Sequence, residues 1–512
     1  MADNQNLFTA LRSAFPDDLD ATAIETADGM ALAYSWRDID EASAMLANLL
    51  ESLELPAGAR VAVQTEKSVE ALMLYLAVLR AGLVYLPLNS AYQSAENAYF
   101  IADAEPSVVA CSPGSFSWVS RLAFSAGTAH VFTLGDERSG SLLQRAAFHA
   151  RTHTPATRHA GDLAAILYTS GTTGRGKGAM LSHGNLLSNA LAMKSYGRWR
   201  RDDVLIHALP IFHVHGLFVA SHAALLGGSR MIWFSRFEAQ AVAARLPDAT
   251  VFMGVPTFYS RLLAEPGFNA EACRRMRLFI SGSAPLLIET FNSFRERSGQ
   301  TILERYGMSE TVMLSSNPCD PADGVRLGGT VGFPLPGVGL RIVDEGGAAC
   351  ARGEIGAIEV TGPNVFRGYW RMPEKTREEF SADGWFKTGD LGRIDAQGYV
   401  TIVGRSTDLI ISGGYNVYPA ELETVLNEMP EVAESAVIGV PHPDFGEAVV
   451  AVVVARPGAA PEPAALIGAL KARVANFKVP KRVFVVAELP RNPMGKVQKN
   501  LLREQHRALF AD

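Results

Sequence analysis

The 512-residue sequence predicts an α/β protein with a large N-terminal domain of parallel β/α sheets, a small β-rich subdomain, and a smaller α+β C-terminal domain. In the first four-fifths, short apolar strands alternate with helical segments, which is typical of parallel sheets covered by helices. From about Gly328, short strands lie between Gly and Pro turns, and after Arg405 helices and strands mix. A chain of this length is also too long for one ordinary core.

The β/α alternation is read from apolar runs of strand length next to segments with helical periodicity. A good strand at 163–170 is followed by a plausible helix that starts near Ser182. The other expected helices are 68–82, 215–228 and 257–265, and the other expected strands are 83–88, 204–209, 229–234, 249–255 and 277–283.

The two-domain division follows from the change of pattern near the C-terminal end. We expect an N-terminal domain at 1–404, with the β-rich subdomain at about 328–404, and a C-terminal domain at 405–512. The boundary is placed near Arg405 to Asp408. In the C-terminal domain we expect helices at 419–430 and 463–477 and strands at 434–441 and 448–455.

Composition excludes several functional classes. The chain is 48% hydrophobic and 20% charged, as in packed soluble proteins, and its net charge of −6 offers no attraction for nucleic acid or anionic lipid. Its 4 cysteines lie far apart without a C-x-x-C pair, which favours a reducing compartment. The most apolar run, 71–88, is interrupted by Arg80 and Gly82, and Met1–Asn6 carries no cation. We therefore expect a cytoplasmic globular protein without a membrane span, a signal peptide or a transit peptide.

The stretch "YTSGTTGRGKGAM", Tyr168 to Met180, has the composition of a phosphate-binding loop. Closely spaced glycines and hydroxyls let backbone N–H groups and side chains converge on phosphate oxygens. The stretch nearly matches the G-x-x-x-x-G-K-[ST] loop, but Gly178 stands where a magnesium-binding hydroxyl is required. By itself it is compatible with a P-loop, another kind of phosphate loop, or a flexible surface turn.

Four later segments decide between these interpretations: "RYGMSET", "KTGD", "GRSTDLIISGGYNVYPAELE" and "PMGKVQK". Each alone is unremarkable. "KTGD" places Asp390 in a Gly-bounded turn, where a lone Asp is usually a cap, and a lysine near the C-terminus such as Lys496 is usually solvated. Together and in this order, they make the chain resemble the adenylate-forming family of acyl-CoA synthetases, luciferases and peptide-synthetase adenylation domains, over essentially its whole length. Within the family it resembles the malonyl-CoA synthetases through "LPIFHVHGLFVAS", "MGVPTFYSRLL", "RLFISGSAPL" and "GPNVFRGYWRMPEKT".

The resemblance implies a two-step reaction that uses ATP, Mg²⁺ and coenzyme A. A carboxylate attacks the α-phosphorus of ATP to give acyl-AMP and pyrophosphate, and the CoA thiol then attacks the acyl carbon and expels AMP. Because the first step brings an anion toward a polyanion, cations and oriented N–H groups must offset the repulsion. The implied acid is malonate, and methylmalonate is also expected to react, since pockets discriminate weakly against one methyl group.

The same resemblance assigns the nucleotide site. The loop from Thr169 to Lys177 is expected to surround the β- and γ-phosphates, Tyr306 to stack on adenine, and Asp390 and Arg405 to bind the ribose. The full expected ATP-binding set is Thr169, Ser170, Gly171, Thr172, Thr173, Gly174, Lys177, Glu304, Tyr306, Gly307, Met308, Ser309, Asp390 and Arg405.

The expected catalytic residues are Lys496, Glu310 and Thr172. By resemblance, Lys496 bridges the substrate carboxylate and the α-phosphate during adenylation, and lysine acetylation there is a family-level expectation. Glu310 and Thr172 are the expected metal residues, because hard cations prefer oxygen ligands.

The family also rotates its C-terminal domain between the two steps. The face that carries Gly413 and Gly414 then forms part of the CoA tunnel, where a passing thiol arm leaves no room for a Cβ atom. Two residues depart from the family pattern: Thr407 stands at the pivot, where Asp or Lys is usual, and Gly176 stands where many relatives have proline.

The acid is predicted from Arg261, which lies in the apolar helical stretch "VPTFYSRLLAE". We expect its guanidinium to be buried, and an unpaired buried guanidinium requires a carboxylate partner such as the distal group of a small diacid. His213 and His215 at i and i+2 are a poor metal-ligand set. The resemblance instead implies that this histidine region lines the acyl pocket, with Ser283 as a further lining residue.

Three alternatives remain. A short-chain or aryl acyl-CoA synthetase would use Arg261 only structurally. A P-loop kinase would form ADP instead of AMP, and is disfavoured by Gly178. A non-catalytic nucleotide sensor is disfavoured because Lys496, Glu310 and Asp390 are all present.

Overall fold

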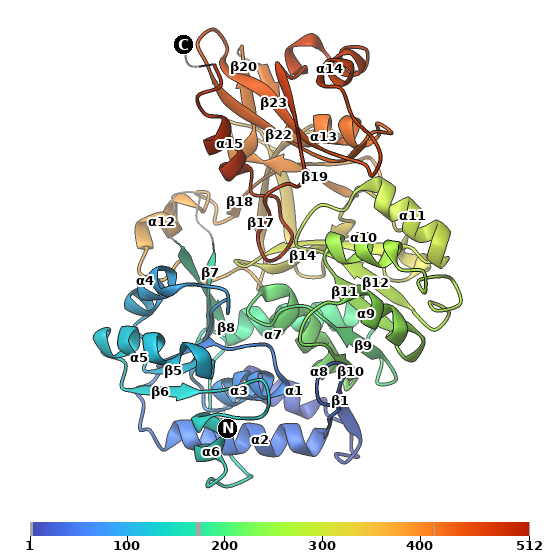
Figure 1. The fold of residues 1–512 in the computed structure, drawn as a ribbon. Helices are drawn as coiled ribbons and strands as arrows, with labels where there is room; N and C mark the ends of the chain where they lie inside the picture. Colours follow the sequence, from blue (N-terminus) through green and yellow to red (C-terminus); the bar gives the residue numbers. More distant parts are fainter. Residues whose placement is uncertain (1–3, 170–175, 414, 511–512) are drawn as a thin grey trace.

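The computed structural model describes residues 4–169, 176–413 and 415–510. It has the predicted mixed α/β architecture, with a smaller C-terminal lobe (orange to red in Figure 1) standing on a larger N-terminal body. In the described part of the chain, no helix is long and apolar enough to cross a membrane.

The largest sheet has nine strands in the order β15-β14-β13-β12-β11-β9-β10-β1-β2. Neighbours from β1 through β13 are parallel, whereas β2, β14 and β15 are antiparallel edge strands. The central strands are buried along their whole length, as expected for parallel strands covered on both faces. The strands are β1 (Thr22–Thr26), β2 (Ala33–Ser35), β9 (Val204–His207), β10 (Arg230–Trp233), β11 (Val251–Gly254), β12 (Leu278–Ser281), β13 (Ile302–Met308), β14 (Val312–Ser316) and β15 (Phe333–Pro334).

A second sheet has six strands in the order β6-β5-β3-β4-β7-β8, all parallel except β8. The helix expected near Ser182 is confirmed as α7 (His183–Tyr196), and the Ser182 hydroxyl accepts a hydrogen bond from the Asn185 N–H. The strands are β3 (Arg60–Gln64), β4 (Val84–Pro87), β5 (Val108–Cys111), β6 (His130–Thr133), β7 (Leu163–Thr169) and β8 (Lys177–Ser182).

The predicted β-rich segment forms a four-stranded antiparallel sheet in the order β16-β17-β18-β19. Asp390 lies inside β18, opposite Arg405 of β19. The expectation that Asp390 sits in a turn is therefore wrong, because the "TGD" segment continues the strand through a positive-φ Gly389. The strands are β16 (Gly339–Val343), β17 (Gly356–Thr361), β18 (Phe386–Ile394) and β19 (Val400–Arg405).

The C-terminal lobe is α+β, as expected. Its sheet has the order β21-β20-β23-β22, with β24 pairing parallel to β23, and apolar side chains form a core on each face. The elements are β20 (Ile410–Ser412), β21 (Tyr415–Val417), α13 (Pro419–Asn427), β22 (Val432–His442), β23 (Gly446–Ala455), α14 (Pro463–Lys471), β24 (Arg482–Val486) and α15 (Lys499–His506).

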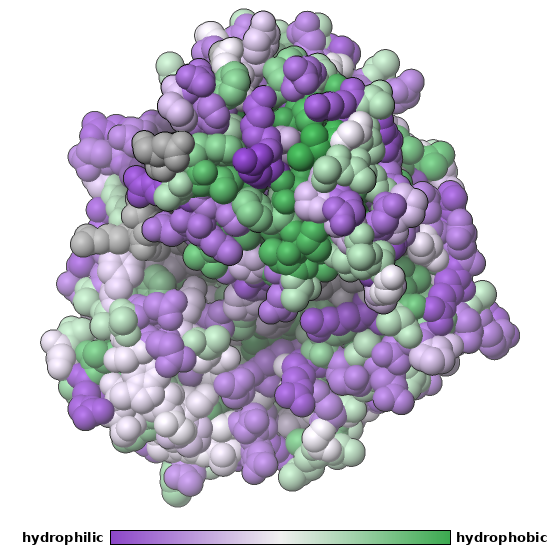
Figure 2. Space-filling model, turned by 45° about the horizontal axis from the view of Figure 1, so that its top comes forward, coloured by the Kyte–Doolittle hydropathy of each residue, from purple (hydrophilic) through white to green (hydrophobic). Residues whose placement is uncertain are grey.

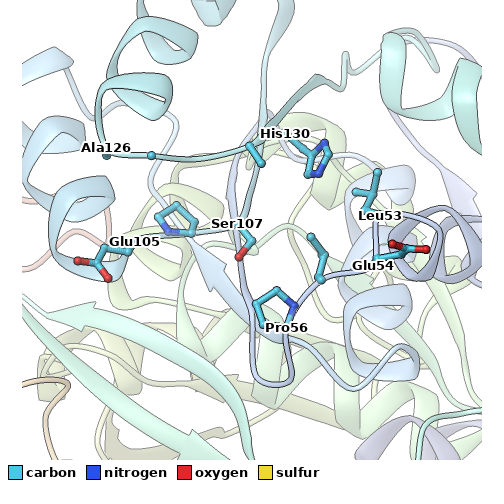
Figure 3. A pocket seen from close by; sticks show the side chains of 11 residues that line it. Leu53, Glu54, Pro56, Glu105, Ser107, Ala126 and His130 are labelled. Atoms are coloured by element: carbon cyan, nitrogen blue, oxygen red, sulfur yellow. The ribbon is translucent and has the colours of Figure 1, made fainter.

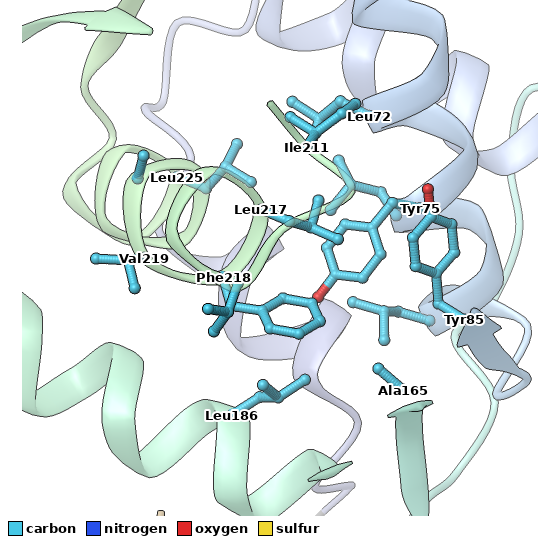
Figure 4. Packing of buried hydrophobic residues seen from close by; sticks show 14 of the residues in the cluster. Leu72, Tyr75, Tyr85, Ala165, Leu186, Ile211, Leu217, Phe218, Val219 and Leu225 are labelled. Carbon is cyan, nitrogen blue, oxygen red and sulfur yellow. The ribbon is translucent and has the colours of Figure 1, made fainter. Parts of the chain in front are cut away.

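The N-terminal core is centred on α3 (Val69–Arg80), in which every residue is buried. Figure 4 shows Tyr75 of this helix between Tyr85 and Phe218, with ring centroids 4.9 and 5.9 Å away. Phe218 belongs to a π-helical segment, His215–Ser221, that leads into α8 (His222–Gly227). The remaining helices are α1 (Leu7–Ser13), α2 (Trp36–Glu51), α4 (Ser94–Ala104), α5 (Phe116–Ser125), α6 (Ser141–Ala146), α9 (Ala239–Arg245), α10 (Pro256–Ala264), α11 (Ile288–Ser298) and α12 (Pro373–Glu378).

Candidate active site

Three predicted nucleotide residues meet at Asp390. Its buried carboxylate accepts a hydrogen bond from the Tyr306 hydroxyl, and Arg405 Nε lies 2.9 Å from Asp390 Oδ1. Burial raises the pKa of Asp390, while Arg405 and the Tyr306 hydrogen bond lower it. The β18–β19 pair and strand β13 thus hold an oriented acceptor group, which suits the two hydroxyls of a ribose.

The loop that carries Lys496 reaches this site from the C-terminal lobe. Asn492 Oδ1 accepts the N–H groups of Met494 and Lys496 at 3.0 and 2.9 Å, which closes a tight turn. Gly495 has a φ of +75°, and a Cβ atom there would lie 3.0 Å from Thr257 Oγ1 on α10. Only glycine suits this turn against the N-terminal body.

Lys496 lies within electrostatic reach of the Asp390 group, although its side chain remains exposed. Neighbouring atoms of the cleft lower the pKa of Lys496 by desolvation, and the positive charge of Arg405 lowers it further. The negative charges of Asp390 and Asp408 raise the pKa of Lys496. The structure therefore brings together the predicted catalytic lysine and the predicted ribose site from two lobes.

Glu310 and Lys177 both contact Tyr369. The buried Glu310 carboxylate accepts the Tyr369 hydroxyl at 2.9 Å, and Lys177 Nζ lies 4.5 Å from the centroid of the Tyr369 ring and 3.3 Å from Glu379 Oε1. Burial raises the pKa of Glu310, and the hydrogen bond from Tyr369 lowers it.

The Glu310 carboxylate is chemically suited to coordinate Mg²⁺. It is the one acid among the predicted metal residues, and within the described residues no group of three His, Cys, Asp or Glu side chains could hold a metal by itself. Mg²⁺ is commonly held by one or two carboxylates together with substrate phosphates and waters. Glu310 would therefore hold the ion together with the nucleotide.

The predicted phosphate loop is a β-hairpin connection. Thr169 ends β7 and pairs with Lys177, which begins the antiparallel strand β8. In a P-loop the lysine opens a helix instead, so the strand contradicts that alternative. The stretch Tyr168–Met180 thus includes the end of β7 and the start of β8. A Cβ atom at Gly178 would lie 2.9 Å from Ile166 Cγ2, so packing explains its missing side chain.

Several predicted residues fall outside the described part of the chain. These are Ser170, Gly171, Thr172, Thr173, Gly174 and Gly414.

The remaining nucleotide residues lie on β13 or directly after it. Glu304 is buried, accepts the Gly329 N–H at 3.1 Å, and has its pKa raised to about 8 by burial. A Cβ atom at Gly307 would lie 1.9 Å from the Val312 carbonyl oxygen, so this position requires glycine. Met308 and Ser309 are half-buried beside them.

His213, His215 and Ser283 also come together. The buried His215 Nδ1 lies 3.1 Å from Ser283 Oγ, and the His215 N–H donates to His213 Nδ1 at 3.2 Å. Burial lowers the pKa of His213 to about 4 and that of His215 to about 3. Both rings are therefore neutral at neutral pH and can act as hydrogen-bond partners.

The position of Arg261 contradicts the prediction that its side chain is buried. It is exposed on α10 and has no hydrogen bond or ion pair with the residues that the structure describes, so the expectation of a buried guanidinium is wrong. The helix buries Tyr259 and Leu262 and leaves position 261 on its open side. Thr257, four residues earlier, lies on the same helix face and meets Gly495. Arg261 therefore lies on the side of α10 that faces the Lys496 loop.

Arg305 is a residue that the sequence analysis missed. Its side chain is buried, Nε donates to Ser316 Oγ at 3.1 Å, and among the described residues Nη1 and Nη2 have no hydrogen-bond partner. Burial lowers the pKa of Arg305 to about 10, and its positive charge contributes to the low pKa of His215. The signal was in the motif "RYGMSET", where strand alternation places Arg305 on the opposite face from Tyr306.

Comparisons with known proteins identify the family of this chain. The AMP-binding enzyme family model matches residues 14–370, and that of the AMP-binding enzyme C-terminal domain matches residues 421–496. The chain belongs to the AMP-binding enzyme family. Malonate–CoA ligase from Arabidopsis thaliana is 34% identical over 481 residues, which cover 87% of this chain and 78% of that protein.

This AMP-binding enzyme is also similar to solved structures. ATP-bound MatB from Rhodopseudomonas palustris is 53% identical, with a TM-score of 0.95 over 99% of this chain and 100% of that one. The apo form of MatB from the same organism, at 52% identity and with coverage of 99% and 100%, has a TM-score of 0.84. The structure as a whole is thus more similar to the ATP-bound form than to the apo form.

Neither of two cavities of the AMP-binding enzyme is lined by a predicted site residue of the described chain. One of about 400 Å³ lies between the end of α2, the α4–β5 connection and the start of β6, and it includes Glu54, Glu105 and His130 (Figure 3). None of the predicted site residues lines it. The surface is instead hollowed below the C-terminal lobe on the face shown in Figure 2.

Proposed function

We propose that this enzyme is an ATP-dependent malonate–CoA ligase. In the first step, malonate and ATP give malonyl-AMP and pyrophosphate; in the second, the CoA thiol gives malonyl-CoA and AMP. The observation that carries the choice of acid is the buried Arg305, whose two terminal nitrogens have no partner among the described residues. The similarity to a malonate–CoA ligase supports the same acid.

The first step uses the group around Asp390. We assign Asp390 and Arg405 to the ribose hydroxyls, Tyr306 to the adenine ring, and Lys496 to the contact that joins the malonate carboxylate to the α-phosphate. A cation between two anionic reactants lowers the repulsion that opposes attack and fixes their geometry. The lysine comes from the other lobe, so this contact forms only when the lobes are arranged as they are here.

The phosphates are assigned to the β7–β8 connection, which the resemblance places around them, with Lys177 as an auxiliary cation. Mg²⁺ held by Glu310 would neutralise part of the phosphate charge. Thr172, outside the described residues, is proposed as a further contact to the α-phosphate and the metal.

Malonate recognition is assigned to Arg305. A bidentate contact to the distal carboxylate satisfies the two free nitrogens, whereas a monocarboxylic acid leaves them buried and unpaired. Sites of this kind reject analogues that lack the charged group much more strongly than analogues with one extra methyl group. Methylmalonate is therefore expected to react. His213, His215 and Ser283 would line the pocket, and Arg261 would meet the substrate from the open side.

The second step is assigned to a rotated C-terminal domain, residues 405–512, that pivots at Thr407. Thr407 is exposed in the 3₁₀ turn Ser406–Asp408 that follows β19, and Gly413 adopts a φ of +59° in the turn after β20. The thiol of CoA would pass Gly413 and Gly414. Lys496 would leave the site, and its acetylation would stop only the first step by removing its charge. A cytoplasmic location, proposed from cysteine usage, belongs to the same hypothesis.

The test is a product assay with ATP, CoA and separate acids: malonate, methylmalonate, butyrate and benzoate. We expect CoA-dependent release of AMP with malonate and methylmalonate. Faster turnover of butyrate or benzoate would instead favour the alternative of a short-chain or aryl acyl-CoA synthetase. ADP as the product would contradict the proposal altogether.

A further inference from the structure

Lys67 is a buried cation outside the site described above. It follows β3 of the six-stranded sheet, and its Nζ reaches the carboxyl ends of β9 and β10 in the nine-stranded sheet. Nζ lies 2.8 Å from the His207 carbonyl oxygen, 2.6 Å from the Phe234 carbonyl oxygen and 3.0 Å from His207 Nδ1. It also lies 4.3 Å from the centroid of the Trp233 ring. Lys67 thus joins the two large sheets at one point.

No carboxylate of the described chain lies within ion-pair distance of this amine. Burial lowers the pKa of Lys67 well below its ordinary range. The three acceptors around Nζ nevertheless match the three donors of an ammonium group. A group this costly to bury implies a function that an apolar side chain of similar length would not provide.

The contacts of His207 indicate which of its two nitrogens carries the proton. A carbonyl oxygen can only accept a hydrogen bond, so the Nε2 that faces the Gly216 carbonyl carries the proton, and Nδ1 accepts from Nζ. Nε2 lies 3.0 Å from the Gly216 carbonyl oxygen and 3.1 Å from Ser221 Oγ. Burial and the neighbouring lysine both lower the pKa of His207 well below its ordinary value, so the ring stays neutral. Its Nε2–H therefore donates to the Gly216 carbonyl.

Gly216 belongs to the π-helical segment that begins at His215. Single π-helical turns are uncommon and are frequently found at functional sites. A Cβ atom at Gly216 would lie 2.2 Å from the Pro210 carbonyl oxygen, so the backbone is held tightly here. At the far end of the segment, the Tyr75 hydroxyl bonds to His222 Nε2 at 2.8 Å, among the packed side chains of Figure 4.

We propose that Lys67 and His207 are positioning residues for the substrate carboxylate site: they hold the Gly216 carbonyl and thereby place His213 and His215. His215 precedes Gly216 directly and bonds to Ser283, whose φ of +72° is unusual for a residue other than glycine. The chain of contacts runs from Lys67 through His207 and Gly216 to His215. This inference rests on the proposed function, because it assigns those histidines to the acid-binding pocket.

The test compares two substitutions of His207 that differ in one donor. In His207→Gln the amide nitrogen can take the place of Nε2 and donate to Gly216, whereas His207→Phe keeps the ring over Trp233 and loses both nitrogens. Lys67→Met removes the amine at similar length, and Lys471→Met on the exposed side of α14 is the surface control. The readouts are the melting temperature and the separate KM values for the acid and for ATP, in pyrophosphate exchange.

We expect His207→Phe and Lys67→Met to raise the KM for the acid by about 10-fold or more, as outer-layer partners of a binding site commonly do, with the KM for ATP unchanged. His207→Gln and Lys471→Met should remain close to wild type. If the two residues had a purely structural role, the variants would have a lower melting temperature and a smaller active fraction. The KM for the acid would then not rise more than the KM for ATP. Equal KM values for the acid in His207→Phe, His207→Gln and wild type would overturn the inference.

The acid used is the one that wild-type enzyme turns over fastest in the product assay. If that acid is not malonate, the proposed function fails while the comparison of variants can still be made. If Lys67→Met does not fold, the two His207 variants decide the question alone.

Discussion

Arg405 and Asp390 face each other across the β18–β19 pair, with Arg405 Nε 2.9 Å from Asp390 Oδ1. The pair lies where the β-rich sheet meets β13 on one side and the Lys496 loop on the other. The strand register fixes the guanidinium, the guanidinium orients the carboxylate, and the Tyr306 hydroxyl occupies its other oxygen. A carboxylate held by these two partners is pre-organised for a ligand with two hydroxyls.

Asp390→Asn tests this arrangement. The amide keeps the shape, but it removes the charge that pairs with Arg405 and can orient its NH₂ group wrongly. We expect the KM for ATP to rise by about 10-fold or more, with little change in the KM for the acid. Steady-state kinetics measure both values. Asp383→Asn, at an exposed aspartate paired with Arg341, is the control and should behave as wild type. An unchanged KM for ATP in Asp390→Asn would show that Asp390 does not bind the nucleotide.

Lys496→Ala separates the two chemical steps. Removing the cation that joins the two anionic reactants should reduce malonate-dependent pyrophosphate exchange by at least about 10²-fold. Formation of malonyl-CoA from supplied malonyl-AMP should remain, because Lys496 is assigned only to the first step. Lys499→Ala, which removes the neighbouring lysine that pairs with Glu423, is the matched control. Normal exchange in Lys496→Ala would show that the lysine is assigned wrongly.

The raised pKa of Glu304 leads us to predict that the stability of the protein depends on pH. Burial raises its pKa from 4.5 to about 8, so between these values the folded protein keeps a proton that the unfolded chain has released. The contribution of this group to stability therefore falls as pH rises from about 4.5 to about 8. Glu304→Gln, which can still accept the Gly329 N–H, should melt at a higher temperature than wild type at pH 8 and at nearly the same temperature at pH 5. Thermal unfolding at the two pH values measures the difference.

The exposed Glu137→Gln variant is the control for that measurement and should follow wild type at both pH values. A gap between Glu304→Gln and wild type that stays constant with pH would mean that Glu304 is ionised in the folded protein.

Gly178→Ser tests why the P-loop hydroxyl is missing. The added Cβ atom would lie 2.9 Å from Ile166 Cγ2 and 3.2 Å from Trp370 Cβ. We expect a melting temperature lower by about 1 °C for roughly 1 kcal/mol of destabilisation in a chain of this length, and no gain in activity. Restored or increased ATP turnover in this variant would indicate that the site is closer to a P-loop than the β8 strand suggests.

Most of the fold could be predicted from the sequence because buried parallel strands appear in it as continuous runs of apolar residues. The runs at 204–209, 229–234, 249–255 and 277–283 correspond to β9, β10, β11 and β12. β8 could not be predicted in this way, since it begins with Lys177 and Gly178 and is specified by its pairing with β7. Asp390 was placed in a turn because Thr, Gly and Asp are turn residues, but the pairing with β19 overrides that preference.

The site was predicted less completely, for a related reason. Sequence motifs identify residues such as Asp390, Arg405 and Lys496, whose proximity only the tertiary structure shows. The apolar composition around Arg261 does not reveal which face of α10 it occupies, and the helix leaves it exposed. Arg305 stood inside a quoted motif, but its burial and its unpaired nitrogens depend on β14 and on the segments that cover it.

The identity of the acid rests on Arg305, and the most direct measurement is the ratio of kcat/KM for malonate to that for butyrate in wild type and Arg305→Met. We expect wild type to prefer malonate, and the variant to lose about 10²-fold or more in kcat/KM for malonate while butyrate is unaffected or improves. Arg261→Met, at the exposed position, should have a smaller effect, and Arg305→Lys serves if the methionine variant does not fold. A wild-type preference for butyrate, or an unchanged malonate preference in Arg305→Met, would contradict the account.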